Sequence, residues 1–346
     1  MTSSTLPLPG GPARPRRALP TGTAQCGALL CVLLINALVA DNFFAIHVQD
    51  GRLFGSLIDI LNRCAPVALL SLGMTLVIAT GGIDLSVGAV MAISGATMAS
   101  LATGGHSLPV IFAAVIGVGL LCGLWNGLLV AVFKIQPIVA TLILMVAGRG
   151  IAQLITDGQI ITIYYTPYFF MGGGYLAGLP FSVFVVAAVF VVLYLAITRT
   201  ALGLFIQAVG INPTAARVAG VQAGRLIVAA YVFCGVCAGI AGLLISSNVK
   251  SADGNNAGQL LELDAILAVT LGGTALTGGR FSLVGSVIGA LIIQTLTYAI
   301  YSLGVPPEIN LVVKAVVVFI VMLLQSPEFR AQVGALARRP GAGALQ

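Results

Sequence analysis

Gly81-Gly82-Ile83-Asp84-Leu85-Ser86-Val87-Gly88 interrupts two long apolar segments of the chain. Apolar residues precede it from Leu61 and follow it up to Thr103, roughly the twenty on each side that a helix needs to cross a bilayer. A carboxylate at such a break usually faces protein or water and often marks a functional path. Asp84 and Ser86 could also cap the following helix while the glycines form the turn, and both roles can hold together.

The composition decides the broad class of the protein. Of the 346 residues, 59% are hydrophobic and only 8% are charged, and the mean hydropathy is +1.09. Soluble domains carry about a quarter charged residues. The net charge of +6 is spread over short clusters between apolar runs, as topology signals are, and forms no patch for nucleic acid. We therefore expect a polytopic membrane protein in contact with lipid.

Hydropathy predicts an all-α transmembrane helical bundle of about ten spans, within a range of eight to ten. The apolar runs lie at 24–44, 61–80, 84–103, 108–133, 137–155, 179–197, 226–246, 260–277, 282–303 and 311–325. The arginine cluster at 14–17 precedes the first run, so the positive-inside rule puts the N-terminus in the cytoplasm. An even number of spans puts both termini there. We expect a disordered tail at 1–23, a membrane domain at 24–325 and a second tail at 326–346.

The first span also resembles a signal peptide, but it lacks an A-x-A ending, so we expect it to be retained. Glycines recur at four-residue spacing in three other spans, which predicts close helix packing. They are Gly119, Gly123 and Gly127, then Gly235 and Gly239, then Gly285 and Gly289.

The sequence has no motif for enzyme chemistry. Its nearest approach to a phosphate-binding loop, at 273–280, lacks the Gly-Lys-Ser/Thr ending that holds phosphate and magnesium. His47 and His106 show no metal-ligand spacing. We therefore expect no catalytic residues, no metal site and no cofactor.

Ionisable residues occur in or near apolar runs, as they do in ion-coupled transporters. They are Arg149, Glu262, Asp264 and Lys314. A secondary transporter is therefore one alternative. The other is that these groups neutralise one another, for instance Arg149 with a carboxylate.

The predicted cytoplasmic loop at 198–225 is expected to contain a short helix. Asn212 can cap it, Pro213 suits its first position, and Gly220 can end it. This helix would expose apolar side chains beside a positive charge, which favours docking to a partner, although an inert interfacial helix has the same pattern. The residues assigned to docking are Asn212, Ala216, Arg217 and Gly220.

The 156–178 stretch has no Lys or Arg and is expected outside the membrane on the non-cytoplasmic face. Its aromatic residues could form an interfacial belt or contact a partner protein. They are Tyr164, Tyr165, Tyr168, Phe169 and Phe170.

Three separated motifs closely resemble the permease subunit of ribose-type sugar ABC importers, from about residue 50 to 325. They are 81–88, 209–221 and 262–280. Further matches at 50–55, 58–63 and 252–258 resemble the galactofuranose branch of that family. The motif residues are Gly81, Gly82, Asp84, Ser86, Gly88, Glu262, Asp264, Gly272, Gly273, Gly278, Gly279 and Arg280.

The resemblance implies a subunit of the bacterial inner membrane that pairs with itself or a sister permease. A separate ATPase would hydrolyse ATP and bind 209–221 as a coupling helix, and a periplasmic sugar-binding protein would deliver substrate. Pro213 departs from the family pattern but is tolerated at a first helical position. Permeases for other pentoses or hexoses, nucleosides or branched-chain amino acids remain alternatives.

Polar residues on the apolar spans are candidates for the substrate path, because their side chains can exchange hydrogen bonds with sugar hydroxyls. They could equally bridge neighbouring helices. The candidates are Asn126, Thr141, Gln153 and Gln294.

Overall fold

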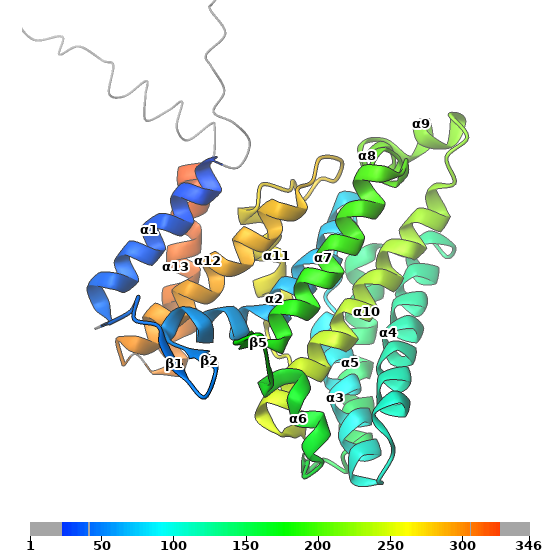
Figure 1. Ribbon diagram of the computed structural model, residues 1–346. Helices are drawn as coiled ribbons and strands as arrows, with labels where there is room; N and C mark the ends of the chain where they lie inside the picture. The colour runs from blue at the N-terminus through cyan, green and yellow to red at the C-terminus, as the bar shows by residue number, and fades with distance from the viewer. Residues whose placement is uncertain (1–22, 41, 305, 326–346) are drawn as a thin grey trace, which may run out of the picture.

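The computed structural model describes residues 23–40, 42–304 and 306–325, and these form a helical bundle (Figure 1). The long helices are α1 (Thr23–Val39), α2 (Ser56–Ala79), α3 (Val87–Thr103), α4 (Leu108–Ala131), α5 (Pro137–Ile155), α7 (Phe181–Arg199), α10 (Ala223–Val249), α12 (Leu283–Ser302) and α13 (Pro307–Gln325). The predicted tails lie outside the described residues, except that Thr23 begins α1.

Shorter elements connect these helices. They are α6 (Thr166–Gly173), α8 (Leu202–Ile211), α9 (Pro213–Val218) and α11 (Leu261–Leu271). Three antiparallel pairs join β1 (His47–Gln49) to β2 (Arg52–Phe54), β3 (Ile160–Thr162) to β6 (Ser251–Asp253), and β4 (Tyr175–Leu176) to β5 (Leu179–Pro180).

Within the described residues, six helices are long and apolar enough to cross a membrane: α2, α4, α5, α7, α10 and α12. The predicted count of about ten spans is therefore not confirmed. The prediction of one continuous span at 260–277 is wrong, because α11 has 11 residues and gives way to a loop after Leu271. Such a helix is roughly 16 Å long, about half the thickness of the hydrocarbon core.

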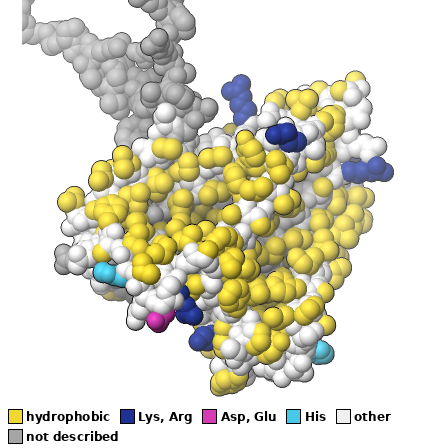
Figure 2. Space-filling view, in the orientation of Figure 1, with side chains coloured by type: hydrophobic (Ala, Val, Ile, Leu, Met, Phe, Trp, Pro, Cys, Tyr) yellow, Lys and Arg dark blue, Asp and Glu magenta, His cyan; other side chains and the backbone are white. Residues whose placement is uncertain are grey.

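The helices differ in what surrounds them. In the most apolar stretch of α2, 83% of the residues are buried within the protein, compared with 11% in α7 and 22% in α4. Apolar side chains cover the visible face of the bundle, and Lys and Arg lie towards its two ends (Figure 2). This distribution fits a bundle in which α2 is enclosed and α4 and α7 face lipid.

The glycines at four-residue spacing lie where helix backbones touch. A Cβ atom on Gly123 of α4 would lie 2.6 Å from Val232 Cα of α10, and one on Gly119 would lie 2.6 Å from the carbonyl oxygen of Gly235. Gly289 of α12 lies in the same way against the backbone of α11. The predicted close packing is confirmed, and the reason is the absence of a side chain at these points.

One residue of the outer aromatic stretch differs from its prediction. Tyr168 is fully buried, and its carbonyl oxygen accepts a hydrogen bond of 2.7 Å from the Ser247 hydroxyl. Tyr164, in contrast, is 84% exposed. Tyr168 therefore belongs to the packing of α6 on α10, and neither a membrane belt nor a partner surface includes it.

Candidate functional site

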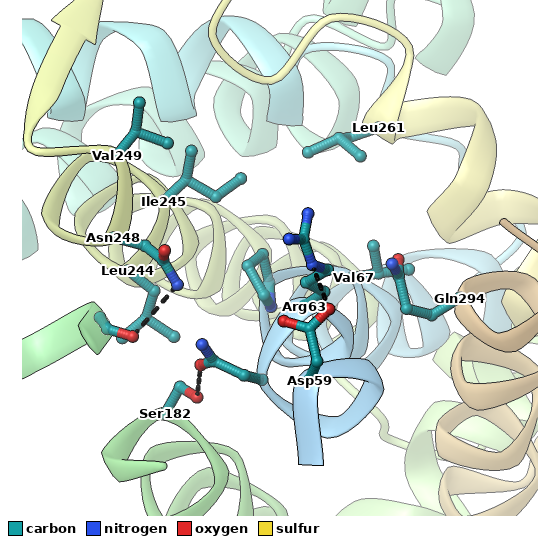
Figure 3. A pocket seen from close by; sticks show the side chains of 13 residues that line it. Asp59, Arg63, Val67, Ser182, Leu244, Ile245, Asn248, Val249, Leu261 and Gln294 are labelled. Atoms are coloured by element: carbon teal, nitrogen blue, oxygen red, sulfur yellow. Dashed lines mark hydrogen bonds and ion pairs between the residues drawn. The ribbon is translucent and has the colours of Figure 1, made fainter. Parts of the chain in front are cut away.

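A polar cavity of about 400 Å³ lies between α2, α7, α10, α11 and α12 (Figure 3). Its volume is in the range of small-molecule sites. The lining residues are Asp59, Asn62, Arg63, Pro66, Val67, Gly172, Ser182, Leu244, Ile245, Asn248, Val249, Leu261 and Gln294. The cavity is at the start of α7 and the end of α10. Because α8 and α9 join the end of α7 to the start of α10, the cavity and these two helices occupy opposite ends of the bundle.

The polar face of α2 forms one wall. Asp59, Asn62 and Arg63 are three and four residues apart, so a helix brings them to one side. The Arg63 Nε atom donates to Asp59 Oδ2 at 2.8 Å, and Figure 3 shows the two side chains turned toward each other. None of the three was among the predicted path residues, although three polar side chains on one face of an apolar helix are a signal that could have found them.

The other walls add neutral polar groups. The Ser182 hydroxyl donates to Asn62 Oδ1 at 2.6 Å, and Asn248 Nδ2 donates to the Gly172 carbonyl oxygen at 3.2 Å (Figure 3). Gln294 reaches the cavity from α12. The amide nitrogen of Asn62 and the amide oxygen of Asn248 remain as a donor and an acceptor for a ligand.

The charge of the cavity is balanced. Its lining contains one acid, Asp59, and one base, Arg63, and these two groups pair with each other. The cavity therefore offers hydrogen-bond donors and acceptors without a net formal charge. A neutral ligand with several hydroxyls suits such a site, because each hydroxyl can both donate and accept.

Only one of the four predicted path residues, Gln294, lines this cavity. Asn126 is buried elsewhere and donates to Ser86 Oγ at 2.8 Å, and Thr141 donates to the Pro137 carbonyl oxygen at 2.9 Å. Gln153 is exposed on α5. Asn126 and Thr141 thus agree with the alternative interpretation, in which polar side chains form hydrogen bonds within the protein and do not line a substrate path.

Asp84 organises the break between α2 and α3. Its Oδ1 atom accepts hydrogen bonds from the backbone nitrogen and the hydroxyl of Ser86, at 2.9 and 2.6 Å. Asn126 of α4 adds a contact of 3.4 Å, and the carboxylate is 1% exposed. The side chain therefore ties the break to α4. Ser86 is the N-cap residue of α3, but its side chain makes no capping hydrogen bond.

The glycines of this break allow close approach by other segments. Gly81 has a φ of +84°, and a Cβ atom on Gly82 would lie 2.6 Å from the Tyr231 hydroxyl. A Cβ atom on Gly88 would lie 2.5 Å from Glu262 Oε2, so the start of α3 touches the start of α11.

The ionisable groups near the apolar spans are partly neutralised. Lys314 Nζ contacts the two carboxylate oxygens of Asp264 at 2.9 and 3.1 Å, as expected for mutual pairing. Arg149 instead donates to the carbonyl oxygens of Asn255 and Ala257, at 3.3 and 2.5 Å. The Oε2 atom of Glu262 is buried and has no hydrogen-bond partner among the described residues.

The last motif forms the loop at 272–282 between α11 and α12. Gly272 packs on Gly285 of α12, and a Cβ atom there would lie 2.6 Å from the Ser286 nitrogen. Positive φ values of +89°, +87° and +89° occur at Gly273, Gly278 and Gly279, a conformation that glycine adopts without strain. Arg280 is exposed.

The predicted cytoplasmic helix is present as α9. The Asn212 side chain accepts from the backbone nitrogens of Thr214 and Ala215, Pro213 begins the helix, and Gly220 follows its end with a φ of +86°. These local predictions are confirmed, because each depends only on residues within one turn.

The exposed face of α9 was predicted to include Ala216 and Val218 beside Arg217, and Val221 after the helix; the structure contradicts this for Ala216 and leaves Val221 partly buried. Arg217 is exposed and Val218 is 87% exposed, but Ala216 is 5% exposed and packs against Val209 and Ala223. Ala216 therefore anchors α9 to its neighbours and does not face a partner.

Comparison with known proteins identifies the family. A family model described as the permease component of a branched-chain amino acid transport system matches residues 56–322. The galactofuranose transporter permease of Escherichia coli is 56% identical, and the alignment covers 95% of this chain and 96% of that protein. The fructose import permease of Bifidobacterium longum is 39% identical (87% and 86% covered), and the ribose import permease of Escherichia coli is 35% identical (86% and 92%). These matches confirm the resemblance found in the sequence motifs. The chain belongs to this family of transport permeases, in which its relatives include import permeases for sugars.

Proposed function

We propose that this chain is the membrane-spanning subunit of an ATP-binding cassette importer that moves a neutral monosaccharide inward, with galactofuranose as the first candidate. The observation that carries the proposal is the polar cavity, whose acid and base are paired with each other. A relative named for galactofuranose at 56% identity supports the choice of sugar. In this proposal a separate ATPase supplies the energy and a periplasmic sugar-binding protein delivers the substrate.

The cavity fits a sugar better than an amino acid. A free amino acid carries an ammonium and a carboxylate, and each is held best by an opposite charge that has no other partner. Asp59 and Arg63 already satisfy each other, whereas the amides of Asn62, Asn248 and Gln294 suit hydroxyls.

We also propose that the chain crosses the inner membrane ten times, with both termini in the cytoplasm. Two contacts support a common cytoplasmic end: Gly273 approaches the side chain of Gln25 near the start of α1, and Gly279 approaches Gly210 of α8. The segment at 254–260 lies against α5 and α3 before α11 begins, since Gly254 touches Ala152. This segment and α11 together would form one broken crossing.

The first test replaces one cavity side chain. Asn62→Asp keeps the acceptor for Ser182 but removes a donor and adds a negative charge. We expect uptake of labelled galactofuranose to fall about tenfold, the effect of one lost hydrogen bond to a buried polar group. The measurement is uptake by a deletion strain that expresses each variant, with membrane levels checked by immunoblot.

Asn255→Asp is the matched control, because it makes the same chemical change in an exposed side chain outside the cavity. It should leave uptake unchanged. Ribose, arabinose and leucine are measured in parallel. If the deletion strain loses leucine uptake and keeps uptake of every sugar, the proposed substrate class is wrong; loss of ribose uptake alone would refute galactofuranose.

A second test addresses the ATPase contact. Arg217→Glu reverses a charge on the exposed face of α9, so we expect weaker co-purification of the ATPase and about tenfold lower uptake. Arg225→Glu is the control, because Arg225 is also exposed, at the start of α10. Normal co-purification and normal uptake in Arg217→Glu would remove α9 from the ATPase interface.

A further inference from the structure

Three segments far apart in the sequence meet at the end of the bundle that carries α9 (Figure 1). They are the end of α2, the end of α8 and the loop at 272–282. The backbone nitrogen of Gly279 donates to the Ala79 carbonyl oxygen at 2.9 Å. Gly210 of α8 lies directly on this pair, and a Cβ atom there would overlap the Ala79 oxygen and lie 3.0 Å from Gly279 Cα.

Two more glycines extend this contact. A Cβ atom on Gly278 would lie 3.0 Å from the Gly210 carbonyl oxygen and 3.1 Å from Gly81 Cα. We call the set Ala79, Gly81, Gly210, Gly278 and Gly279 the glycine junction. Its segments touch backbone to backbone, and a close-packed contact without flexible side chains transmits displacement directly.

The junction joins the helix that we assign to ATPase docking to the helices around the cavity. On one side, α8 runs through Asn212 into α9. On the other side, α2, α11 and α12 end or begin at the junction, and their far parts line the cavity through Asn62, Leu261 and Gln294. Thr75 of α2 also donates to the Ser286 hydroxyl of α12 at 2.7 Å, so these helices are tied together.

We propose that Gly210 is a positioning residue for transport. Its missing side chain lets α8 pack directly on Ala79 and Gly279. When the ATPase displaces α9, this contact therefore displaces α2 and the loop between α11 and α12 as well. The cavity then changes shape when the ATPase moves. This inference rests on the proposed role of α9 and adds the route by which that role reaches the substrate.

The test is Gly210→Ala in the complete complex of permease, ATPase and sugar-binding protein. The added methyl group must separate α8 from the junction, whereas the docking face of α9 is unchanged. We expect the ATPase to co-purify and to hydrolyse ATP, but sugar uptake in proteoliposomes to fall about tenfold. The number of ATP molecules hydrolysed per sugar transported should therefore rise about tenfold, a ratio that a simple loss of folded protein does not alter.

Gly224→Ala is the matched control, because Gly224 is also helical and a Cβ atom there would meet nothing within 4 Å. A second variant, Ile211→Ala, loosens the same contact without inserting atoms: the Ile211 side chain lies over Gly279 and is 73% exposed. If Gly210→Ala fails to assemble, Ile211→Ala is measured in its place and should raise the same ratio of ATP hydrolysed to sugar transported.

A normal ratio of ATP to sugar in an assembled Gly210→Ala complex would overturn the inference. So would a normal ratio in Ile211→Ala, should Gly210→Ala fail to assemble. If the ratio is normal but Arg217→Glu still lowers uptake, the proposed function stands and only the role of the glycine junction is wrong. If Arg217→Glu also has no effect, the role of α9 itself has failed.

Discussion

Lys314→Ala is expected to destabilise the membrane domain by about 3–5 kcal/mol, the cost of leaving a buried charge without its partner. Lys314 is 8% exposed, and its only described carboxylate contact is Asp264, whose side chain is 15% exposed. Removing the ammonium leaves an uncompensated carboxylate between α11 and α13. The variant should show a much lower melting temperature in detergent and a reduced level in membranes.

The matched control is Lys134→Met, which removes an exposed ammonium from the loop between α4 and α5. The double variant Asp264→Leu/Lys314→Met should recover most of the lost stability, because it removes both charges. If Lys314→Ala had the melting temperature of the original protein, the ion pair between Asp264 and Lys314 would not contribute to stability.

Gly123→Val should separate α4 from α10 and prevent stable folding. A Cβ atom at this position would already lie 2.5 Å from the Tyr231 carbonyl oxygen, and the two methyl groups of valine would extend the overlap. Because backbone atoms cannot move aside as a side chain can, we expect a loss of at least about 3 kcal/mol. Thermal unfolding of the purified protein in detergent measures the effect.

Gly117→Val is the corresponding change six residues earlier on the same helix. There a Cβ atom would meet nothing within 4 Å, so the melting temperature should be nearly unchanged. Equal losses in both variants would mean that valine itself weakens α4, and the close contact with α10 would not be the cause.

Local sequence signals predicted the elements that depend on neighbouring residues. The apolar runs at 108–133 and 137–155 correspond to α4 and α5, with ends that agree within two residues. The agreement is close because the composition changes sharply where each run begins and ends. The caps of α9 followed from Asn212 and Gly220 for the same reason. The motif resemblance predicted the family, which the comparisons confirm.

Long-range packing could not be predicted in the same way. Hydropathy averaged over 260–277 concealed the end of α11 at Leu271, because apolar loop residues count as much as helical ones. Helices α2 and α7 are both apolar, yet only α2 is enclosed by protein. Ala216 illustrates the same limit, since a small residue suits an exposed or a buried position equally well.

The cavity was only partly accessible from sequence. Gln294 was found because it interrupts an apolar span, but Asp59 and Arg63 lie at the start of α2, where charged residues are ordinary. Only the fold shows that Ser182 and Asn248, from two other helices, line the same cavity as Asp59 and Arg63.

The shortness of α11 also bears on how the chain is made. A segment of 11 residues that carries Glu262 and Asp264 is a poor substrate for insertion by itself, since each carboxylate opposes entry into hydrocarbon. Lys314, the partner of Asp264, is synthesised 50 residues later. Helices α11, α12 and α13 must therefore settle together, because Asp264 has its partner in the membrane only once Lys314 of α13 is in place.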